Sequence, residues 1–456
     1  MTTSLISRVL GVAVAASLLL PSLAVAQAAD PLPPVAIDPA IAAAIAKISP
    51  DRLRSFDTKL VSFGTRSTFS EQLGPKRGIF AARDFIAAQF REIAKSSGGR
   101  LRVAYDEHVQ PADANRIPRD VLISSVVATL VGDDPSGPTY VMSSHMDSRN
   151  SSNEDAIKDA PGADDNGSGS AAVVETARVL APLHFRGTIL FCTFDSEEQG
   201  LLGAEHLART LAAAKTTLDA DINNDIIGAS VGHDGIKRGD IVRLYSEALP
   251  PDAALKDVNV YGLENDSPSR QVARYAKEIG EAYVPAMHVD MQYRADRYGR
   301  GGDHEAFNAQ GFAGVRFTEA AENFDHQHQD VRVENGIQYG DLLEFMDFDY
   351  LARVTQINAS IMASLAAAPA KPKRLTTTNP PYVYDTVLKW SASSGAASYE
   401  VVWRRSSESQ WKHARNVGNV TSYTATNLTK DNDQFGVRAL DAQGHRSIVS
   451  FPTLVR

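Results

Sequence analysis

The fold class is decided by the stretch Thr188-Ile-Leu-Phe-Cys-Thr-Phe194 and by the acidic run Asp195-Ser-Glu197-Glu198 that follows it directly. A short, almost continuous apolar run is typical of a strand that is buried on both faces, as in parallel sheets. Helical patterns flank this strand at residues 169–180 and 201–213. Because strands that alternate with helices form βαβ units, the pattern predicts an α/β fold with a mostly parallel mixed sheet flanked by helices.

The same alternation extends in both directions from this strand. Apolar residues recur every three or four positions from Ile79 to Ile93 and predict a helix there. Ser267-Pro268 supplies an N-cap and a first-turn proline for another helix. A long helical segment is expected at residues 339–365, and strands are expected at residues 121–130, 139–144, 222–227 and 312–317. The α/β domain is therefore expected to span residues 38–365.

A different pattern begins after a linker at residues 366–373, which is rich in Pro, Ala and Lys. All three tryptophans lie beyond it, in short runs of alternating apolar and polar residues at 387–390, 399–404, 435–440 and 447–451. This alternation predicts a small all-β sandwich over residues 374–456. The runs that begin at Leu388, Tyr399 and Phe435 resemble the B, C and F strands of a fibronectin type III domain.

The first 26 residues have the features of a secretory signal peptide. They contain no acidic residue, an apolar run at residues 9–20, and Ala24-Val25-Ala26, the small-x-small pattern that signal peptidase cleaves. The apolar run is shorter than the roughly 20 residues needed to cross a bilayer, and no later run reaches that length. We therefore expect a secreted or periplasmic protein with no membrane span.

Composition and charge exclude several classes of protein. Hydrophobic residues make up 43% and charged residues 22% of the 456 positions, the balance of an ordinary globular protein. The formal charge of −9 offers nothing that would attract a nucleic-acid backbone. Cys192 is the only cysteine, so no intramolecular disulfide can form, and its apolar strand predicts a buried small hydrophobic residue.

Polar residues with metal-binding side chains cluster where the predicted strands end. Five such clusters occur: Ser143-Ser-His145-Met-Asp147, Gly162-Ala-Asp164-Asp165-Asn-Gly-Ser-Gly169, Asp195-Ser-Glu197-Glu198, Asn223-Asn-Asp225 and Asn323-Phe-Asp-His326-Gln-His328-Gln-Asp330. Open α/β sheets bind their ligands at the carboxyl ends of the strands. Each cluster alone is more often a turn, a helix start or a surface hydrogen bond. Together they would repel and lose hydration unless divalent cations neutralised them.

Rival motifs do not fit this sequence. Gly167-Ser-Gly169-Ser-Ala-Ala172 matches a loose dinucleotide fingerprint, but an acidic loop leads into it and would repel pyrophosphate. The chain has no Gly-x-Ser-x-Gly elbow. His304-Glu305 lacks the second histidine of the metalloprotease helix.

With these motifs the sequence resembles the co-catalytic dizinc aminopeptidases of the bacterial leucyl aminopeptidase type, which share a fold with glutaminyl cyclases and the transferrin-receptor ectodomain. The likeness covers roughly residues 38–365 and implies a zinc-exopeptidase-like fold with two Zn²⁺ ions. It also implies the following roles: His145 as a metal ligand, Asp147 as the carboxylate that orients it, Asp164 as the aspartate that bridges both metals, Glu197 as the general base, and Glu198 and Asp225 as further ligands. A cis peptide bond is implied at Asp164-Asp165.

The last ligand should be a histidine near the segment 326–328. His328 is favoured over His326, although either could be aligned with the family pattern. His304 resembles a residue that borders the family's site without binding metal. Tyr298 lies near the place of a tyrosine that helps to hold the oxyanion in some members.

The leading hypothesis is a secreted zinc aminopeptidase that removes N-terminal residues from peptides. If Asp164 bridges, one metal takes Asp164, Glu198 and His328, and the other takes His145, Asp164 and Asp225. Glu197 would then take a proton from the attacking water and pass it to the departing amine. A carboxypeptidase could use the same metals, a glutaminyl cyclase is disfavoured by the full ligand sets, and a non-catalytic binding ectodomain would be expected to have lost ligands. The sequence indicates no partner for the β-domain.

Overall fold

The computed structural model describes residues 30–249, 258, 261–378 and 382–455. The predicted signal peptide, residues 1–26, lies outside the described residues. Within the described part of the chain, no helix is both long and apolar enough to cross a membrane.

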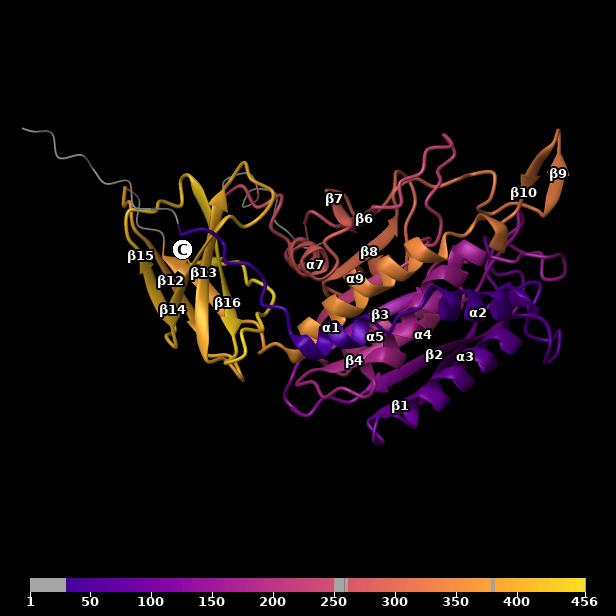
Figure 1. The fold of residues 1–456 in the computed structure, drawn as a ribbon, viewed down its shortest axis with the longest axis horizontal. Coiled ribbons are helices and arrows are strands. Elements are labelled where there is room, and N and C mark those ends of the chain that lie inside the picture. Colours follow the sequence, from indigo (N-terminus) through magenta and orange to yellow (C-terminus); the bar gives the residue numbers. More distant parts are fainter. Residues whose placement is uncertain (1–29, 250–257, 259–260, 379–381, 456) are drawn as a thin grey trace, which may run out of the picture.

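An eight-stranded mixed sheet organises the larger part of the molecule (Figure 1). Its spatial order is β1-β2-β4-β3-β5-β8-β6-β7. The strands are β1 (Leu101–Gln110), β2 (Val121–Leu130), β3 (Thr139–His145), β4 (Thr188–Phe194), β5 (Leu218–Asn224), β6 (Ile241–Ser246), β7 (His288–Gln292) and β8 (Gly314–Glu319). The central strands β4, β3, β5 and β8 run parallel to one another. The pairs β1–β2, β2–β4 and β6–β8 are antiparallel. The predicted α/β fold with a mixed sheet is confirmed.

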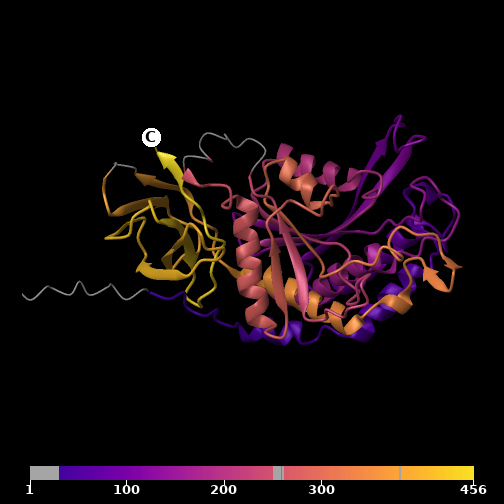
Figure 2. The ribbon, with the colours of Figure 1, turned by 90° about the horizontal axis from the view of Figure 1, so that it is seen from above.

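Helices cover both faces of this sheet (Figure 2). One face carries α1 (Pro39–Ile45), α2 (Pro50–Val61), α3 (Ile79–Ala94), α4 (Gly169–Leu180), α7 (Pro268–Tyr283) and α9 (Phe348–Ala367), and the other carries α5 (Leu202–Ala213) and α8 (His304–Ala309). Strand β4 shows how the sequence serves both layers. Ile189 and Phe191 join the core under the first set of helices, while Leu190, Cys192 and Phe194 join the core under the second. Cys192 is buried and free, as predicted.

Several boundaries differ from the predicted ones. The last long helix begins at Phe348 rather than near residue 339, because the Asp347 side chain accepts a hydrogen bond from the Tyr350 N–H and caps it there. Residues 337–339 instead form β10 (Ile337–Tyr339), which pairs with β9 (Arg332–Glu334). Strand β5 ends at Asn224, so Asp225 lies just beyond the strand rather than within it.

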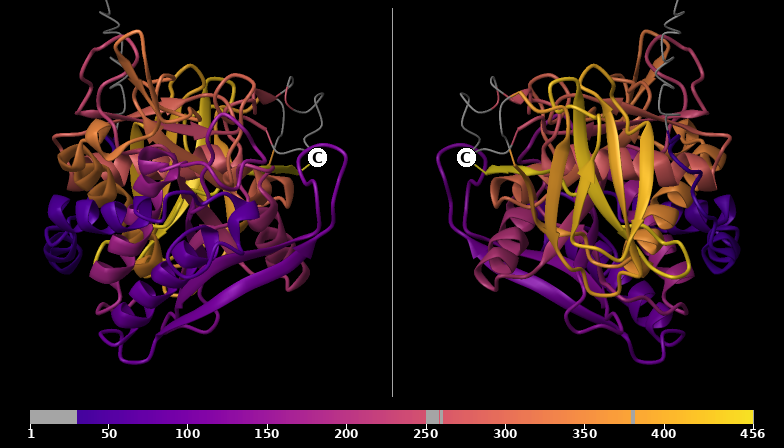
Figure 3. Two further views of the ribbon diagram at one scale, coloured as in Figure 1. Left: turned by 90° about the vertical axis from the view of Figure 1, so that its right-hand side faces the viewer. Right: turned by 90° about the vertical axis from the view of Figure 1, so that its left-hand side faces the viewer.

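The C-terminal strands form two small sheets at one end of the molecule (Figure 3). They are β11 (Lys373–Thr378), β12 (Thr386–Ser391), β13 (Ser398–Arg405), β14 (His413–Gly418), β15 (Ser422–Ala425), β16 (Asp433–Leu440) and β17 (Thr453–Val455). Trp390, Tyr399 and Trp403 are buried in a core between them. The strand expected at 447–451 is reduced to an isolated pairing of Ser450 with Val437. The two sheets agree with the predicted small all-β sandwich, whereas its resemblance to a fibronectin type III domain stays a prediction.

Buried ion pairs join these strands to α7, which stands beside them in Figure 1. Arg438 of β16 is fully buried and pairs with Glu400 of β13 at 2.8 Å and with Glu278 of α7 at 3.0 Å. Arg404 of β13 pairs with Asp266, just before α7, at 2.6 Å. Removing one partner of a buried ion pair is strongly destabilising. These contacts therefore fix the β-region, the C-terminal strands β11 to β17, against the α/β region.

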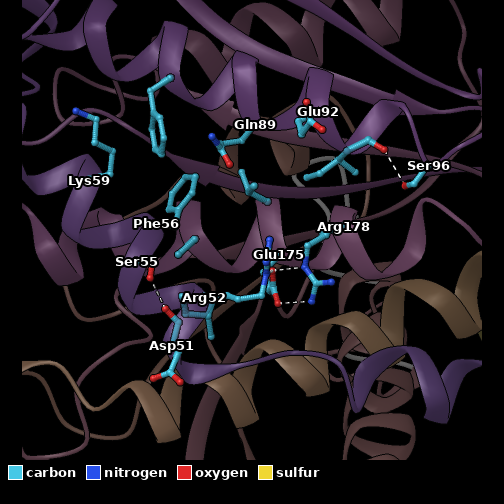
Figure 4. Close-up of a pocket in the computed structure, with 15 residues that line it drawn as sticks. Asp51, Arg52, Ser55, Phe56, Lys59, Gln89, Glu92, Ser96, Glu175 and Arg178 are labelled. Carbon is cyan, nitrogen blue, oxygen red and sulfur yellow. Dashed lines mark hydrogen bonds and ion pairs between the residues drawn. The ribbon is translucent and has the colours of Figure 1, made fainter.

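A groove with a volume of about 540 Å³ lies between α2, α3 and α4 (Figure 4). Phe56 and Phe85 contact each other on its wall, with ring centroids 5.1 Å apart. Glu175 lies between Arg52, at 3.3 Å, and Arg178, at 2.6 Å. None of the predicted metal ligands lines this groove, so it belongs to the helical layer and not to the candidate site.

Candidate active site

The carboxyl ends of four neighbouring strands bring the candidate residues together. His145 is the last residue of β3, Asp195 follows β4, and Asp225 follows β5. These strands are parallel neighbours with β8, so their carboxyl ends meet at one edge of the sheet. The loop with Asp165, before α4, and the segment with His328, after β8, reach the same edge.

Two overlapping groups of side chains at this edge could each hold a metal ion. In the first group, His145 Nε2 lies 3.2 Å from Asp165 Oδ1 and 3.5 Å from Asp225 Oδ1. In the second group, His328 Nε2 lies 2.8 Å from Asp165 Oδ2 and 3.0 Å from Glu198 Oε1. Asp165 belongs to both groups and offers one carboxylate oxygen to each, so it has the geometry of a bridging ligand.

This geometry corrects the assignment of Asp164. The Asp164 side chain is in neither group, and its Oδ1 instead accepts a hydrogen bond from the Gly228 N–H at 2.7 Å. The cis peptide bond also lies one residue later than predicted, at Asp165-Asn166. Two adjacent aspartates point in different directions, and nothing in the local sequence pattern distinguishes them.

The backbone around these aspartates explains which of them reaches the site. The backbone N–H groups of Asp164 and Asp165 both donate to the Asp341 carboxylate, at 2.9 and 2.7 Å. Gly162 has a left-handed φ of 54°, and a Cβ there would lie 2.6 Å from the Asp165 carbonyl oxygen. Asp341 was not predicted as a site residue, because it follows the strand pair β9–β10 and belongs to no recognised motif.

Asp164 has a different partner on the far side of the loop. Burial raises the pKa of Asp164 to about 6, against a hydrogen bond with Glu319 that lowers it. Burial and the neighbouring Asp164 carboxylate raise the pKa of Glu319 well above its ordinary value. The Asp164 side chain therefore interacts with Gly228 and Glu319 and is directed away from the two ligand groups.

The donor atoms in both groups fit a metal ion. His145 Nε2, Glu198 Oε1 and Asp225 Oδ1 are buried and have no hydrogen-bond partner among the described residues. Leaving such atoms unpaired costs free energy, and a cation that accepts their lone pairs removes this cost. Imidazole nitrogen and carboxylate oxygen are ligands that zinc prefers in proteins, and the residues present fit zinc.

The second carboxylate oxygen of Asp225 and that of Glu198 are each held by an arginine. Asp225 Oδ2 lies 3.0 Å from Arg316 on β8, and Glu198 Oε2 lies 2.9 Å from Arg149. Burial opposes ionisation of Asp225, but Arg316 and His145 hold the pKa of its carboxyl below the ordinary value. Neither arginine was predicted, because no motif marks them.

Asp147 contacts the ligand residues on both sides of it, and the predicted role of its carboxylate, which lies 3.4 Å from His145 Nδ1, stays a prediction. Its backbone carbonyl oxygen lies 3.1 Å from His145 Nδ1, which directs Nε2 of the same ring toward Asp165 and Asp225. Its carboxylate accepts hydrogen bonds from the backbone N–H groups of Glu197 and Glu198, at 3.2 and 3.1 Å. Asp147 therefore ties the position of His145 to that of the Glu197-Glu198 pair.

Glu197 lines the cleft beside both groups but belongs to neither. Burial raises the pKa of its carboxyl well above the ordinary value, His145 opposes this, and Asp225 and Glu198 add to it. A carboxyl group whose pKa is raised in this way is suited to accept and to release a proton.

The structure also distinguishes the remaining candidates. His328 lies in the second group, whereas His326 stacks on Phe345 with ring centroids 3.5 Å apart. Burial disfavours a charged His328, but Glu198 and Asp165 raise its pKa to about 10. His304 is buried, with Nε2 2.9 Å from the Ala295 carbonyl oxygen, and does not join either group. Tyr298 is 87% exposed and does not line the cleft, so the predicted substrate-binding role finds no support in its position.

An open cleft of about 390 Å³ gives access to these groups. Its lining includes the four carboxylates Asp165, Glu197, Glu198 and Asp225 together with His328. It also includes the four arginines Arg116, Arg149, Arg297 and Arg300. The cleft and the ligand groups form one site.

Comparison with known proteins identifies the family. Residues 125–348 match the description "Peptidase family M28". A probable zinc metalloprotease of Leptosphaeria maculans is 44% identical over 418 residues, which cover 90% of this chain and 96% of that protein. A probable zinc metalloprotease of Pyricularia oryzae is 42% identical over 427 residues, with coverages of 91% and 84%. The chain therefore belongs to peptidase family M28, and its similarity to zinc metalloproteases supports a metallopeptidase, with which the two candidate ligand groups agree.

Solved structures share the fold at lower identity. The LapA aminopeptidase of Legionella pneumophila matches with a TM-score of 0.52 and 18% identity, over 72% of this chain and 74% of that chain. LapB of the same organism matches with a TM-score of 0.52 and 17% identity, over 73% and 76%. These likenesses support the zinc-exopeptidase-like arrangement of sheet and helices.

The shared position of Asp165 gives a direct test of the corrected assignment. Asp165→Asn should weaken metal binding at least about 100-fold, beyond the 10–100-fold typical of losing a residue outside the ligand set, because an amide is a poorer ligand at both groups. Asp164→Asn is the matched control and should keep a near-normal metal-to-protein ratio. Both are measured by elemental analysis of the purified protein after dialysis against a weak chelator. Metal loss in Asp164→Asn with retention in Asp165→Asn would reverse the assignment.

Proposed function

We propose that the protein is a secreted, zinc-dependent aminopeptidase that uses two metal ions to remove N-terminal residues from peptides. The observation that carries the proposal is the shared Asp165 carboxylate, which offers one oxygen to each of two three-residue ligand groups. Family membership supports peptide hydrolysis, and the descriptions of the curated relatives support zinc.

The residues of this chain have separate roles in such a reaction. Zinc bound by the two groups would acidify a water molecule and polarise the carbonyl of the scissile bond. Glu197, which is placed by the hydrogen bond from its backbone N–H to Asp147, accepts the proton of the attacking water. The same carboxyl then donates this proton to the departing amine nitrogen, so that no net proton is gained or lost at Glu197.

Other activities on this fold receive less support. A non-catalytic binding ectodomain would have no need for complete ligand groups with a carboxylate base beside them, and both are present. A glutaminyl cyclase is disfavoured because both metal positions have full sets of ligand residues. A carboxypeptidase is the closest rival, because the metal groups alone do not set the direction in which the substrate binds.

Substrates with free and blocked N-termini test the proposed polarity. The purified protein should hydrolyse a leucyl-peptide with a free amine and should leave its N-acetylated counterpart intact. Chelation should abolish hydrolysis, because zinc is the proposed Lewis acid of the reaction. Added zinc should restore it. Shortening of the acetylated peptide from its C-terminus would show a carboxypeptidase instead.

Exchange of Glu197 separates the base from the ligands. Glu197→Gln should retain its metal, because Glu197 belongs to neither group, while turnover should fall about 10²–10⁴-fold through loss of the proton acceptor. Glu198→Gln is the companion variant and should weaken metal binding instead. Turnover is measured at saturating substrate together with the metal content of each variant. Near-normal turnover in Glu197→Gln would contradict its role as base.

Secretion rests on the first 26 residues and has its own test. A signal peptidase that recognises Ala24-Val25-Ala26 would leave Gln27 as the first residue of the mature chain. N-terminal sequencing of the protein recovered from periplasm or culture medium should therefore begin at Gln27. A chain that keeps residues 1–26 and remains inside the cell would contradict the proposal.

A further inference from the structure

Four arginines surround the candidate active site. Arg116 comes from the connection between β1 and β2, Arg149 follows β3, and Arg297 and Arg300 come from the connection between β7 and α8. All four line the same cleft as the metal-ligand groups. Three separate segments of the chain therefore bring guanidinium groups to one opening.

The charges of the cleft do not balance once its ligands are assigned. The carboxylates that line it are those of Asp165, Glu197, Glu198 and Asp225, and each is a proposed ligand or the base. Two divalent cations would offset these four negative charges, so that the arginines depend on acidic groups behind the lining, which Arg297 has in Asp296 and Glu322 and Arg300 has in Glu322. The described lining also offers no further carboxylate to bind a substrate ammonium group.

Arg297 and Arg300 share an acidic partner, Glu322, with a further arginine behind the cleft lining. Glu322 pairs with Arg243 at 2.8 Å, with Arg297 at 3.0 Å and with Arg300 at 2.8 Å. Arg297 is also held by Asp296 at 2.9 Å, whereas Arg300 shares the Glu322 carboxylate with Arg243 and Arg297. The Arg300 side chain keeps 31% of its surface exposed, so part of it remains open to a ligand.

Of the four arginines, Arg116 has the fewest acidic groups to offset its positive charge. It is exposed, and the hydrogen bond it forms runs from Nη1 to the Glu198 carbonyl oxygen, at 3.3 Å. Within the described residues it has no carboxylate partner, whereas Arg119 on the same connection is held by Glu71 at 2.6 Å. Arg116 is therefore a free cation positioned directly over a proposed metal ligand.

We propose that this cleft selects substrates that carry a carboxylate within one or two residues of the scissile bond, and that Arg116 is its main contact, with Arg300 beside it. The carboxylate is either the free C-terminus of a short peptide or an acidic side chain, since a guanidinium group pairs with both in the same way. This inference rests on the proposed peptidase function and names its substrate class.

A panel of four dipeptides distinguishes the two sources of the carboxylate. Leu-Ala carries a free C-terminus, Leu-Ala-amide carries none, and Leu-Glu-amide is compared with the neutral Leu-Gln-amide. In the metal-loaded enzyme, kcat/KM for a carboxylate-bearing substrate should exceed that of its neutral match about 10- to 100-fold, the range for one hydrogen-bonded charged contact. Preference for Leu-Ala alone assigns the C-terminus, and preference for Leu-Glu-amide alone assigns the side chain.

Arg116→Gln should remove most of this preference, because kcat/KM should fall more for each carboxylate-bearing substrate than for its neutral match. Lys158→Gln removes a positive charge from an exposed position outside the cleft lining and is the matched control, which should keep the full preference. The preference should also shrink as salt is raised, because exposed charge pairs are screened. Equal rates on all four peptides in the wild type, or an equal loss on all four in Arg116→Gln, would overturn the proposal.

A binding measurement separates this proposal from the proposed function. Calorimetry with the metal-loaded Glu197→Gln variant should give a lower Kd for Leu-Ala than for Leu-Ala-amide, or for Leu-Glu-amide than for Leu-Gln-amide. Adding Arg116→Gln should abolish the difference. If acetylated peptides with a free carboxylate are cut and bound better, the aminopeptidase polarity fails while carboxylate selection stands. If neutral amides are cut and bound as well as the others, carboxylate selection fails while the peptidase stands.

Discussion

The structure depends on keeping several buried carboxylates at the edge of an apolar sheet. Burial alone favours the neutral form of each, and the chain compensates with permanent cations. Arg316 is fully buried on β8 and reaches the Asp225 carboxylate at 3.0 Å. Arg66 is fully buried as well, and its guanidinium donates to the carbonyl oxygens of Met146, at 2.7 Å, and Gly162, at 2.8 Å. The loops that carry the ligands are therefore built around buried arginines, which do not lose their charge.

Many of the regular elements and the place of the site could be predicted from the sequence. The directions of the side chains in the loops of the site could not. Helix α4 and strand β4 have the predicted bounds, because apolar periodicity continues to their ends. No apolar pattern indicates whether Asp164 or Asp165 faces the metal site. The backbone of both is held by hydrogen bonds to Asp341, which is distant in the sequence. Strands β1, β6 and β7 went unpredicted. In β1, at the edge of the sheet, polar residues alternate with partly buried ones and give a weak apolar signal.

The β-region contributes to the site indirectly, through α7. Helix α7 packs on β6, β7 and β8, and the connection that follows β7 carries Arg297 and Arg300 to the cleft wall. Glu278 of α7 and Asp266 before it each have arginine partners in the β-region. Loss of the β-region would leave these acidic groups with fewer partners at a newly exposed surface. All proposed ligands nevertheless lie before α9. The β-region therefore stabilises the elements behind the cleft and contributes no metal ligand.

Arginine suits this site better than lysine, because a planar guanidinium can serve two carboxylates at once. Arg316 shows this directly, since it lies 3.0 Å from Asp225 and 3.1 Å from Asp296, which in turn pairs with Arg297 at 2.9 Å. A continuous chain of ion pairs thus runs from a proposed metal ligand to an arginine of the cleft wall. The ion pairs that keep Asp225 ionised are therefore connected to an arginine that a substrate meets on entering the cleft.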